Sequence, residues 1–138
     1  MIDRLRDLCF LPGISGREHA VREYLIKAIG DTAVCTTDAL GNLIVFKKGK
    51  SKPKNTVMLA AHMDEVGFLV TFITQEGLLK FTAVGGVDPK VYFGRPVRIG
   101  KEGIPGVVGI KPVHLLKDEE CGCMPETDNL YIDIGAQD

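Results

Sequence analysis

The spacing of hydrophobic residues is helical in the first thirty positions of the chain. In residues 2–11 and again in residues 16–29, apolar side chains fall on one side of a helix and charged side chains on the other. Pro12 and Gly13 separate the two segments, and Gly30 is well placed to end the second. The sequence therefore predicts two helices at the amino-terminal end.

A capping pattern precedes the second predicted helix. Ser15 is followed three positions later by Glu18, as in a capping box. In that arrangement the Ser15 hydroxyl accepts a hydrogen bond from the Glu18 amide, and the Glu18 carboxylate reaches back. We therefore expect Ser15 to cap this helix.

The hydrophobic pattern becomes strand-like after the second predicted helix. Residues 33–37 and 42–48 predict two short strands joined by a turn at residues 38–42. Residues 49–55 form a polar stretch with three lysines, for which a solvated loop is expected. The apolar run at residues 56–61 predicts a buried strand.

From Val66 onward the helical signal disappears. Short apolar runs broken by Gly and Pro predict strands at residues 67–74, 78–86, 95–100, 105–113 and 129–135. Their spacing indicates a small barrel or sandwich. The chain therefore changes character near residue 67, from α/β before it to all-β after it.

The candidate metal-binding and catalytic side chains lie at the end of the apolar run at residues 56–61. His62, Asp64 and Glu65 follow it directly, and ligands collect at the carboxyl ends of strands in α/β sheets. His62 and Asp64 are two residues apart, so extended backbone points both to the same side. A metal-binding imidazole needs a carboxylate or carbonyl on its second nitrogen, and Asp64 fits that role. The alternative is that His62 is a hydrogen-bonded structural residue.

Composition and charge narrow the class of protein. The 138 residues are 45% hydrophobic and 25% charged, as in a soluble globular protein. The net charge of −1 gives no electrostatic case for nucleic acid or an anionic membrane as a partner. We find neither an apolar run of the roughly 18 residues that a membrane span needs nor a signal-peptide core. We therefore expect a cytoplasmic protein with its four cysteines reduced.

Two other motifs have weaker support. Cys121 and Cys123 could bind zinc with His114, but the Cys-x-Cys spacing is short and a fourth ligand is not evident, so free thiols are favoured. The glycines at residues 85–86 could suggest a phosphate loop, but no helix with a Lys-Ser/Thr pair follows. We expect a glycine turn there, which Asp88 fixes by bonding to nearby amides.

Six ordered stretches carry a resemblance to a known family. They are LPGISGREHAVREYL at 11–25, DALGNLI at 38–44, MLAAHMDEVGFLV at 58–70, GGVDPKVYFGRPVRI at 85–99, GVVGIKPVHLL at 106–116 and NLYIDIGA at 129–136. The chain resembles the amino-terminal part of the tetrahedral aminopeptidases, also called glutamyl or deblocking aminopeptidases. These are cytosolic dinuclear metallopeptidases, and the order and spacing agree across essentially the whole chain.

The resemblance implies roles for two residues. His62 matches the family's first metal ligand, and Asp64 matches the catalytic aspartate that orients this imidazole without binding metal. It implies a peptide substrate and two divalent metal ions, zinc or cobalt, which polarise the scissile carbonyl and generate the attacking hydroxide. It also implies a separate glutamate as general base.

The resemblance also implies the domain organisation. Residues 1–67 are expected to be the amino-terminal portion of a zinc-peptidase-like α/β catalytic domain. Residues 68–138 are expected to be part of an inserted, β-rich and barrel-like domain used for oligomerisation. Family members assemble into homo-oligomers, so a homo-oligomer is expected here.

The remaining ligands of such a centre are missing from this sequence. Family members are longer, and their bridging aspartate, glutamate pair and late histidine follow the inserted domain. Glu119 and Glu120 come too early and are expected to be solvent-exposed, and neither His19 nor His114 is expected to be a second ligand. We therefore expect this chain alone to have no peptidase activity.

Two rival functions stay open at this stage. The first is a non-catalytic β-rich oligomerisation module, in which His62 and Asp64 are vestigial. The second is an endoglucanase-type glycoside hydrolase, a label that some family members carry. It ranks last, because we find no pair of carboxylates on facing elements for glycosidase chemistry.

Overall fold

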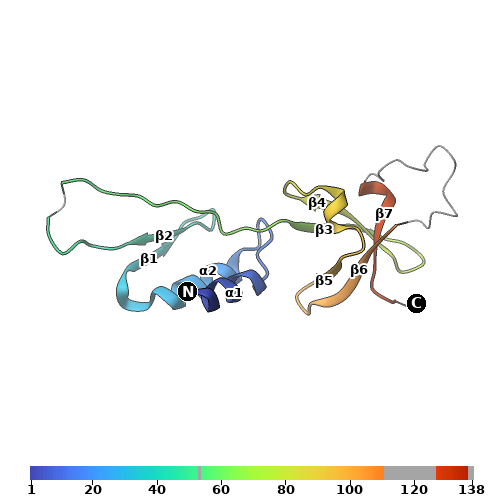
Figure 1. Cartoon of the computed structure of the whole chain (residues 1–138), viewed down its shortest axis with the longest axis horizontal. Helices are drawn as coiled ribbons and strands as arrows, with labels where there is room; N and C mark the ends of the chain where they lie inside the picture. Colours follow the sequence, from blue (N-terminus) through green and yellow to red (C-terminus); the bar gives the residue numbers. More distant parts are fainter. Residues whose placement is uncertain (53, 111–126, 137–138) are drawn as a thin grey trace. The chain divides into compact units, whose positions relative to one another are not determined.

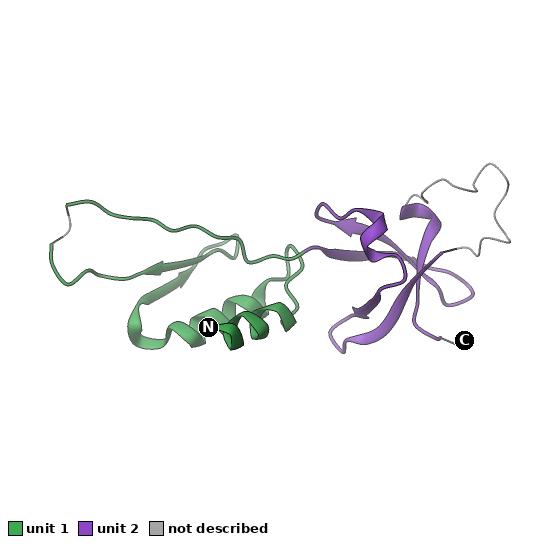
Figure 2. Cartoon of the chain, in the orientation of Figure 1, with its two compact units in different colours: residues 1–65 green, residues 66–138 purple. Residues whose placement is uncertain are grey.

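The protein divides into two compact units. The computed structural model describes residues 1–52, 54–110 and 127–136, and the units comprise residues 1–65 and 66–138 (Figure 2). The division lies close to the change of pattern expected near residue 67. The assignment of the two parts to a catalytic and an inserted domain stays a prediction.

The first unit begins with two helices, as the sequence predicts. α1 spans Ile2–Phe10 and α2 spans His19–Ile29, followed by the short 3-10 helix η1 at Gly30–Thr32 (Figure 1). Gly30 ends α2 with a φ of 52°, a conformation that glycine adopts at little cost. The Tyr24 hydroxyl on α2 donates a hydrogen bond to the Asp7 carboxylate on α1 at 2.8 Å, which ties the two helices together.

A β-hairpin follows the helices. β1 (Val34–Thr37) pairs with β2 (Leu43–Phe46) in antiparallel register. The Asp38 carboxylate holds the turn, because it accepts from the amides of Leu40 and Asn42 at 3.0 and 2.8 Å and from the Asn42 side chain at 2.8 Å. The hydrogen bond from the Asn42 side chain is the largest cause that holds the pKa of Asp38 below its usual range. The hairpin predicted from the sequence is confirmed.

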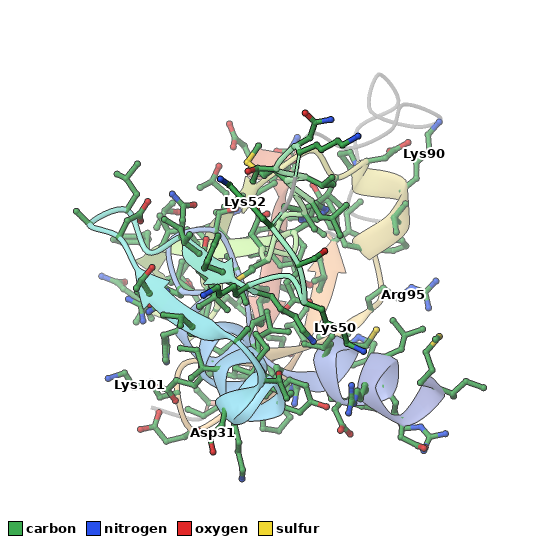
Figure 3. All side chains as sticks on the ribbon, turned by 90° about the vertical axis from the view of Figure 1, so that its left-hand side faces the viewer. Asp31, Lys50, Lys52, Lys90, Arg95 and Lys101 are labelled. Carbon is green, nitrogen blue, oxygen red and sulfur yellow. The ribbon has the colours of Figure 1, made fainter. Side chains whose placement is uncertain are left out.

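The lysine-rich loop is exposed, as predicted, at every position that the structure describes in it. Lys50 and Lys52 of this loop are labelled in Figure 3. The strand predicted at residues 56–61 is wrong, because this segment belongs to no sheet in the described part of the chain. All six of its residues are exposed, and Leu59 is 93% exposed. The apolar run predicts burial only if neighbouring strands exist, and among the described strands β1 and β2 pair only with each other.

The described residues of the second unit form a five-stranded antiparallel sheet. Its strands lie in the order β3-β4-β7-β6-β5, and every pairing is antiparallel. Their bounds are β3 Gly67–Ile73, β4 Leu79–Val84, β5 Pro96–Ile99, β6 Ile104–Ile110 and β7 Leu130–Asp133, with the 3-10 helix η3 at Thr127–Asn129. Each run after Val66 that the sequence predicts as a strand overlaps one of these strands. The mixed α/β class is thereby confirmed.

A short helix interrupts the second unit where the sequence predicts only a glycine turn. α3 spans Pro89–Tyr92 between β4 and β5. The Asp88 carboxylate accepts from the Lys90 amide at 3.0 Å, so the expected bond to a nearby amide is confirmed and serves as an N-cap. Pro89 occupies the first helical position, which suits its fixed φ and missing amide hydrogen.

The core of the second unit is apolar and contains a cluster of three rings. Phe68 meets Phe81 and Tyr92 edge to face, with ring centroids 4.7 and 4.9 Å apart. The Tyr92 hydroxyl lies 2.8 Å from the Thr127 hydroxyl, which satisfies the polar end of a buried ring. The buried members of the core are Leu79, Phe81, Tyr92, Val108, Leu130 and Ile132.

Candidate functional site

The site is built where the loop before α2 meets the segment that carries His62. The Glu65 amide donates to the Gly13 carbonyl at 2.8 Å, and the Gly13 amide donates to the Glu65 carboxylate at 3.1 Å. Ile14 and Glu65 form an isolated parallel β-bridge. Two chain segments about fifty residues apart are therefore fixed against each other at this point.

Gly13 permits this close approach. A Cβ atom at Gly13 would stand 2.9 Å from Cγ2 of Val21 on α2 and 3.5 Å from the carbonyl oxygen of Met63. Real Cβ atoms essentially never come within 3.0 Å of a heavy atom of a residue that is not adjacent in the chain. A side chain at Gly13 would therefore push the loop away from α2 or from the His62 segment.

The structure brings His62 and Asp64 together. Nδ1 of His62 lies 3.1 Å from Oδ1 of Asp64 and 3.0 Å from the Asp64 backbone carbonyl. Both oxygens are acceptors, so Nδ1 of the neutral ring carries the proton and Nε2 presents its lone pair. The His62 side chain is 85% exposed, so Nε2 is accessible from solvent. The roles assigned to these two residues stay predictions.

Ser15 is a third member of this group, and sequence reasoning misplaced it. Its hydroxyl donates to Oδ2 of Asp64 at 2.5 Å. The predicted capping box is wrong, because α2 starts later, with Glu18 as N-cap and no side-chain cap bond. The Glu18 carboxylate instead accepts from the Gly16 amide at 2.7 Å. The capping pattern is local, whereas the acceptor that Ser15 uses lies 49 positions away in the sequence.

Hydrogen bonding stabilises the ionised form of Asp64. The bond from the Ser15 hydroxyl is the largest cause that holds the pKa of the Asp64 carboxyl below its usual range, and the bond from His62 lowers it further. Asp64 is therefore a carboxylate at neutral pH. A carboxylate that accepts from Nδ1 keeps the imidazole in the tautomer that a metal ligand requires.

The chemistry of these donors fits one position of a metal site. An imidazole nitrogen with a carboxylate behind it is a usual ligand of zinc and similar divalent ions. Among the residues that the structure describes, no group of three His, Cys, Asp or Glu side chains is placed to hold a metal ion. The described residues thus supply one ligand and its orienting acid, and a two-metal centre requires several more.

The other sequence candidates do not join this group. His19 is exposed at the start of α2. Cys121, Cys123 and His114 of the alternative zinc site, and the pair Glu119 and Glu120, lie outside the described residues. In the described ranges, no helix combines the length and the hydrophobicity needed to cross a membrane.

Comparisons with known proteins identify the family of the chain. The family model of M42 glutamyl aminopeptidase matches residues 41–138. A lysyl aminopeptidase of Pyrococcus furiosus is 38% identical over 130 residues, which cover 91% of this chain and 37% of that protein. The chain therefore spans little more than a third of the length of this relative.

Solved structures extend the similarity to the fold. The TET aminopeptidase of a marine sediment Thaumarchaeota archaeon matches with a TM-score of 0.87 and 32% identity, over 98% of this chain and 38% of that one. The TET1 peptidase of Pyrococcus horikoshii, which can assemble into a tetrahedron or a large octahedral shell, matches with a TM-score of 0.81 and 41% identity. That match covers 99% of this chain and 41% of the other.

Proposed function

The chain belongs to the M42 glutamyl aminopeptidase family, and from this premise we propose that it is the amino-terminal part of a metal-dependent aminopeptidase that removes terminal residues from peptides. One observation carries the proposal. The exposed imidazole of His62 is oriented by Asp64 through Nδ1, at 3.1 Å, and leaves Nε2 accessible. A histidine that served only the fold would be expected to use its nitrogens within the structure.

In the proposed site, His62 is a metal ligand through Nε2, and Asp64 is the catalytic aspartate that orients it. The family resemblance calls for two divalent ions, zinc or cobalt, which when bound polarise a carbonyl group and lower the pKa of water. The contribution of this chain is to hold Nδ1 protonated and to fix the plane of the ring. Asp64 does both, because its carboxylate and its backbone carbonyl both accept from Nδ1, while Ser15 holds the other carboxylate oxygen.

The two units have separate proposed roles. Residues 1–67 would form the first part of the catalytic α/β domain, and residues 68–138 the first part of a β-rich, barrel-like inserted domain for oligomerisation. The assembly of the TET1 peptidase of Pyrococcus horikoshii supports a homo-oligomer. Light scattering should find dimers or larger particles, and a clean monomer would contradict this proposal. A cytoplasmic location agrees with the free thiols of Cys9 and Cys35.

The site needs ligands beyond those in the described residues. We expect the 138-residue chain to hydrolyse no aminoacyl substrate with added zinc or cobalt, because one histidine cannot hold two ions. A polypeptide extended to the full length of the relatives should bind metal and show activity. Its His62→Ala variant should lose both, whereas a His19→Ala variant should keep them. Clear turnover by the 138-residue chain, or full activity of the extended His62→Ala variant, would refute this assignment.

A further inference from the structure

The Asp64 carboxylate has two different partners, one for each oxygen. Oδ1 faces Nδ1 of His62 at 3.1 Å, and Oδ2 accepts the hydrogen bond from Ser15 at 2.5 Å. Ser15 thus contacts the group that orients the imidazole without touching the imidazole itself. We propose that Ser15 is a positioning residue, whose hydroxyl holds the Asp64 carboxylate in the rotamer that keeps Nδ1 of His62 protonated.

Asp64 gains from such an anchor because it is only partly enclosed, although a backbone amide bond of Asp64 itself also acts on the carboxylate. The side chain is 42% exposed, and the terminal torsion of an aspartate is broad. Without a second contact, the carboxylate would exchange its oxygens and turn toward water. A hydroxyl bound to an ionised oxygen is among the stronger hydrogen bonds, so the Ser15 contact is sufficient to select one orientation.

The loop that carries Ser15 is itself fixed on both sides. Before it, Gly13 and Glu65 exchange two hydrogen bonds. After it, the Arg17 amide donates to the Ile14 carbonyl at 2.8 Å and closes a turn. The Ser15 hydroxyl therefore faces Asp64 as a consequence of backbone contacts, and it loses little conformational freedom when it forms the bond. The Gly13–Glu65 contacts are what bring Ser15 to the site.

This inference rests on the proposed function, since the orientation of His62 matters only if Nε2 binds metal. Its test needs neither metal nor substrate. The tautomer of His62 is read from the 15N chemical shifts of its two ring nitrogens in the 138-residue chain, because these shifts distinguish the two neutral tautomers from each other and from the imidazolium. The wild-type chain should show Nδ1 protonated.

The decisive comparison is between Ser15→Ala and Ser15→Thr. Ser15→Ala removes the donor that anchors the Asp64 carboxylate, while the Asp64 backbone carbonyl at 3.0 Å still accepts from Nδ1. The ratio of the two tautomers should therefore shift toward protonated Nε2 by about two- to threefold. Ser15→Thr retains a hydroxyl and should restore the wild-type ratio. Thr32→Ala is the matched control, because it removes a hydroxyl bond of 2.6 Å to the Ile29 carbonyl in the same unit. It should leave His62 unchanged.

The Glu65 amide reports separately whether the loop stays in place. It donates to the Gly13 carbonyl, so its slow hydrogen exchange in Ser15→Ala would show that only the hydroxyl was lost. A wild-type tautomer ratio in Ser15→Ala overturns the proposal, as does an equal shift in Thr32→Ala. The two proposals can also fail separately. If the tautomer shifts as expected but the extended polypeptide binds no metal and is inactive, the aminopeptidase function is refuted and the positioning role of Ser15 remains.

Discussion

Replacing Gly13 by alanine tests how tightly the loop must lie against α2. The new Cβ atom would stand 2.9 Å from Cγ2 of Val21. Val21 is 7% exposed, and a β-branched side chain has one strongly preferred rotamer in a helix. It cannot turn aside cheaply, so either α2 or the loop has to move. Movement of the loop would carry the Gly13 carbonyl away from the Glu65 amide.

Two opposing effects determine how much Gly13→Ala changes the free energy of unfolding. Overpacking of a close contact costs about 1–3 kcal/mol. Alanine also restricts the unfolded chain relative to glycine, which stabilises the fold by about 0.4–1 kcal/mol. The backbone of Gly13 is outside the left-handed region, so alanine adds no backbone strain. The steric effect wins, and we expect a net destabilisation of roughly 0.5–2 kcal/mol.

Amide hydrogen exchange measures this change locally. The opening that exposes the Glu65 amide should become about 2- to 30-fold more frequent in Gly13→Ala. The Val108 amide, which donates to the Arg95 carbonyl in the second unit, should exchange as in the wild type. Gly49→Ala is the matched control, because a Cβ there makes only an ordinary contact of 3.5 Å.

A second variant separates the steric cause from any other. Val21→Ala removes the Cγ2 atom that the new Cβ would meet, so Gly13→Ala should cost much less in that background. Equal exchange rates at Glu65 in wild type and Gly13→Ala would refute the close contact. An unchanged cost in the Val21→Ala background would show that the effect has another origin.

Two further variants test the supporting structure. Tyr92→Phe removes the hydroxyl that meets Thr127 at 2.8 Å, so chemical denaturation should show the second unit less stable by about 0.5–1.5 kcal/mol, and an unchanged midpoint would contradict this. The folded state lowers the pKa of Asp38. The turn is therefore most stable at a pH above the usual pKa range of aspartate, and it weakens as the pH falls through the pKa of the folded state. The protection of the Leu40 and Asn42 amides against hydrogen exchange, measured relative to the intrinsic exchange rate at each pH, should fall over that interval in the wild type, whereas Asp38→Asn should abolish the dependence.

Elements with a local signature follow from the sequence. The helical period and Gly30 fix α2, and short runs between Gly and Pro fix the strands of the second unit. Asp88 was correctly placed on a backbone amide, although the short helix that it caps was missed. A four-residue helix has too few positions to show a period, and only its capping residue and the proline after it give a signal.

Features that depend on distant residues could not be derived in this way. Ser15 fits a local capping pattern, but its hydroxyl prefers the charged oxygen of Asp64, which the chain brings near only on folding. The pairing of His62 with Asp64 follows from the sequence because they are two positions apart in the chain. The strand expected at residues 56–61 is wrong because it depends on distant residues. Apolar character indicates a strand only where another strand offers hydrogen bonds.

The exposed run at residues 56–61 also has a consequence for handling the polypeptide. The window TVMLAA contains no charge, proline or glycine, and it has the hydrophobic, weakly charged character of segments that stack into cross-β fibrils. Because this segment joins no sheet in the described part of the chain, its backbone can pair with identical segments of other molecules. Purified material should therefore be kept dilute and cold, and a lysine introduced at Met58 would act as a gatekeeper against fibril growth.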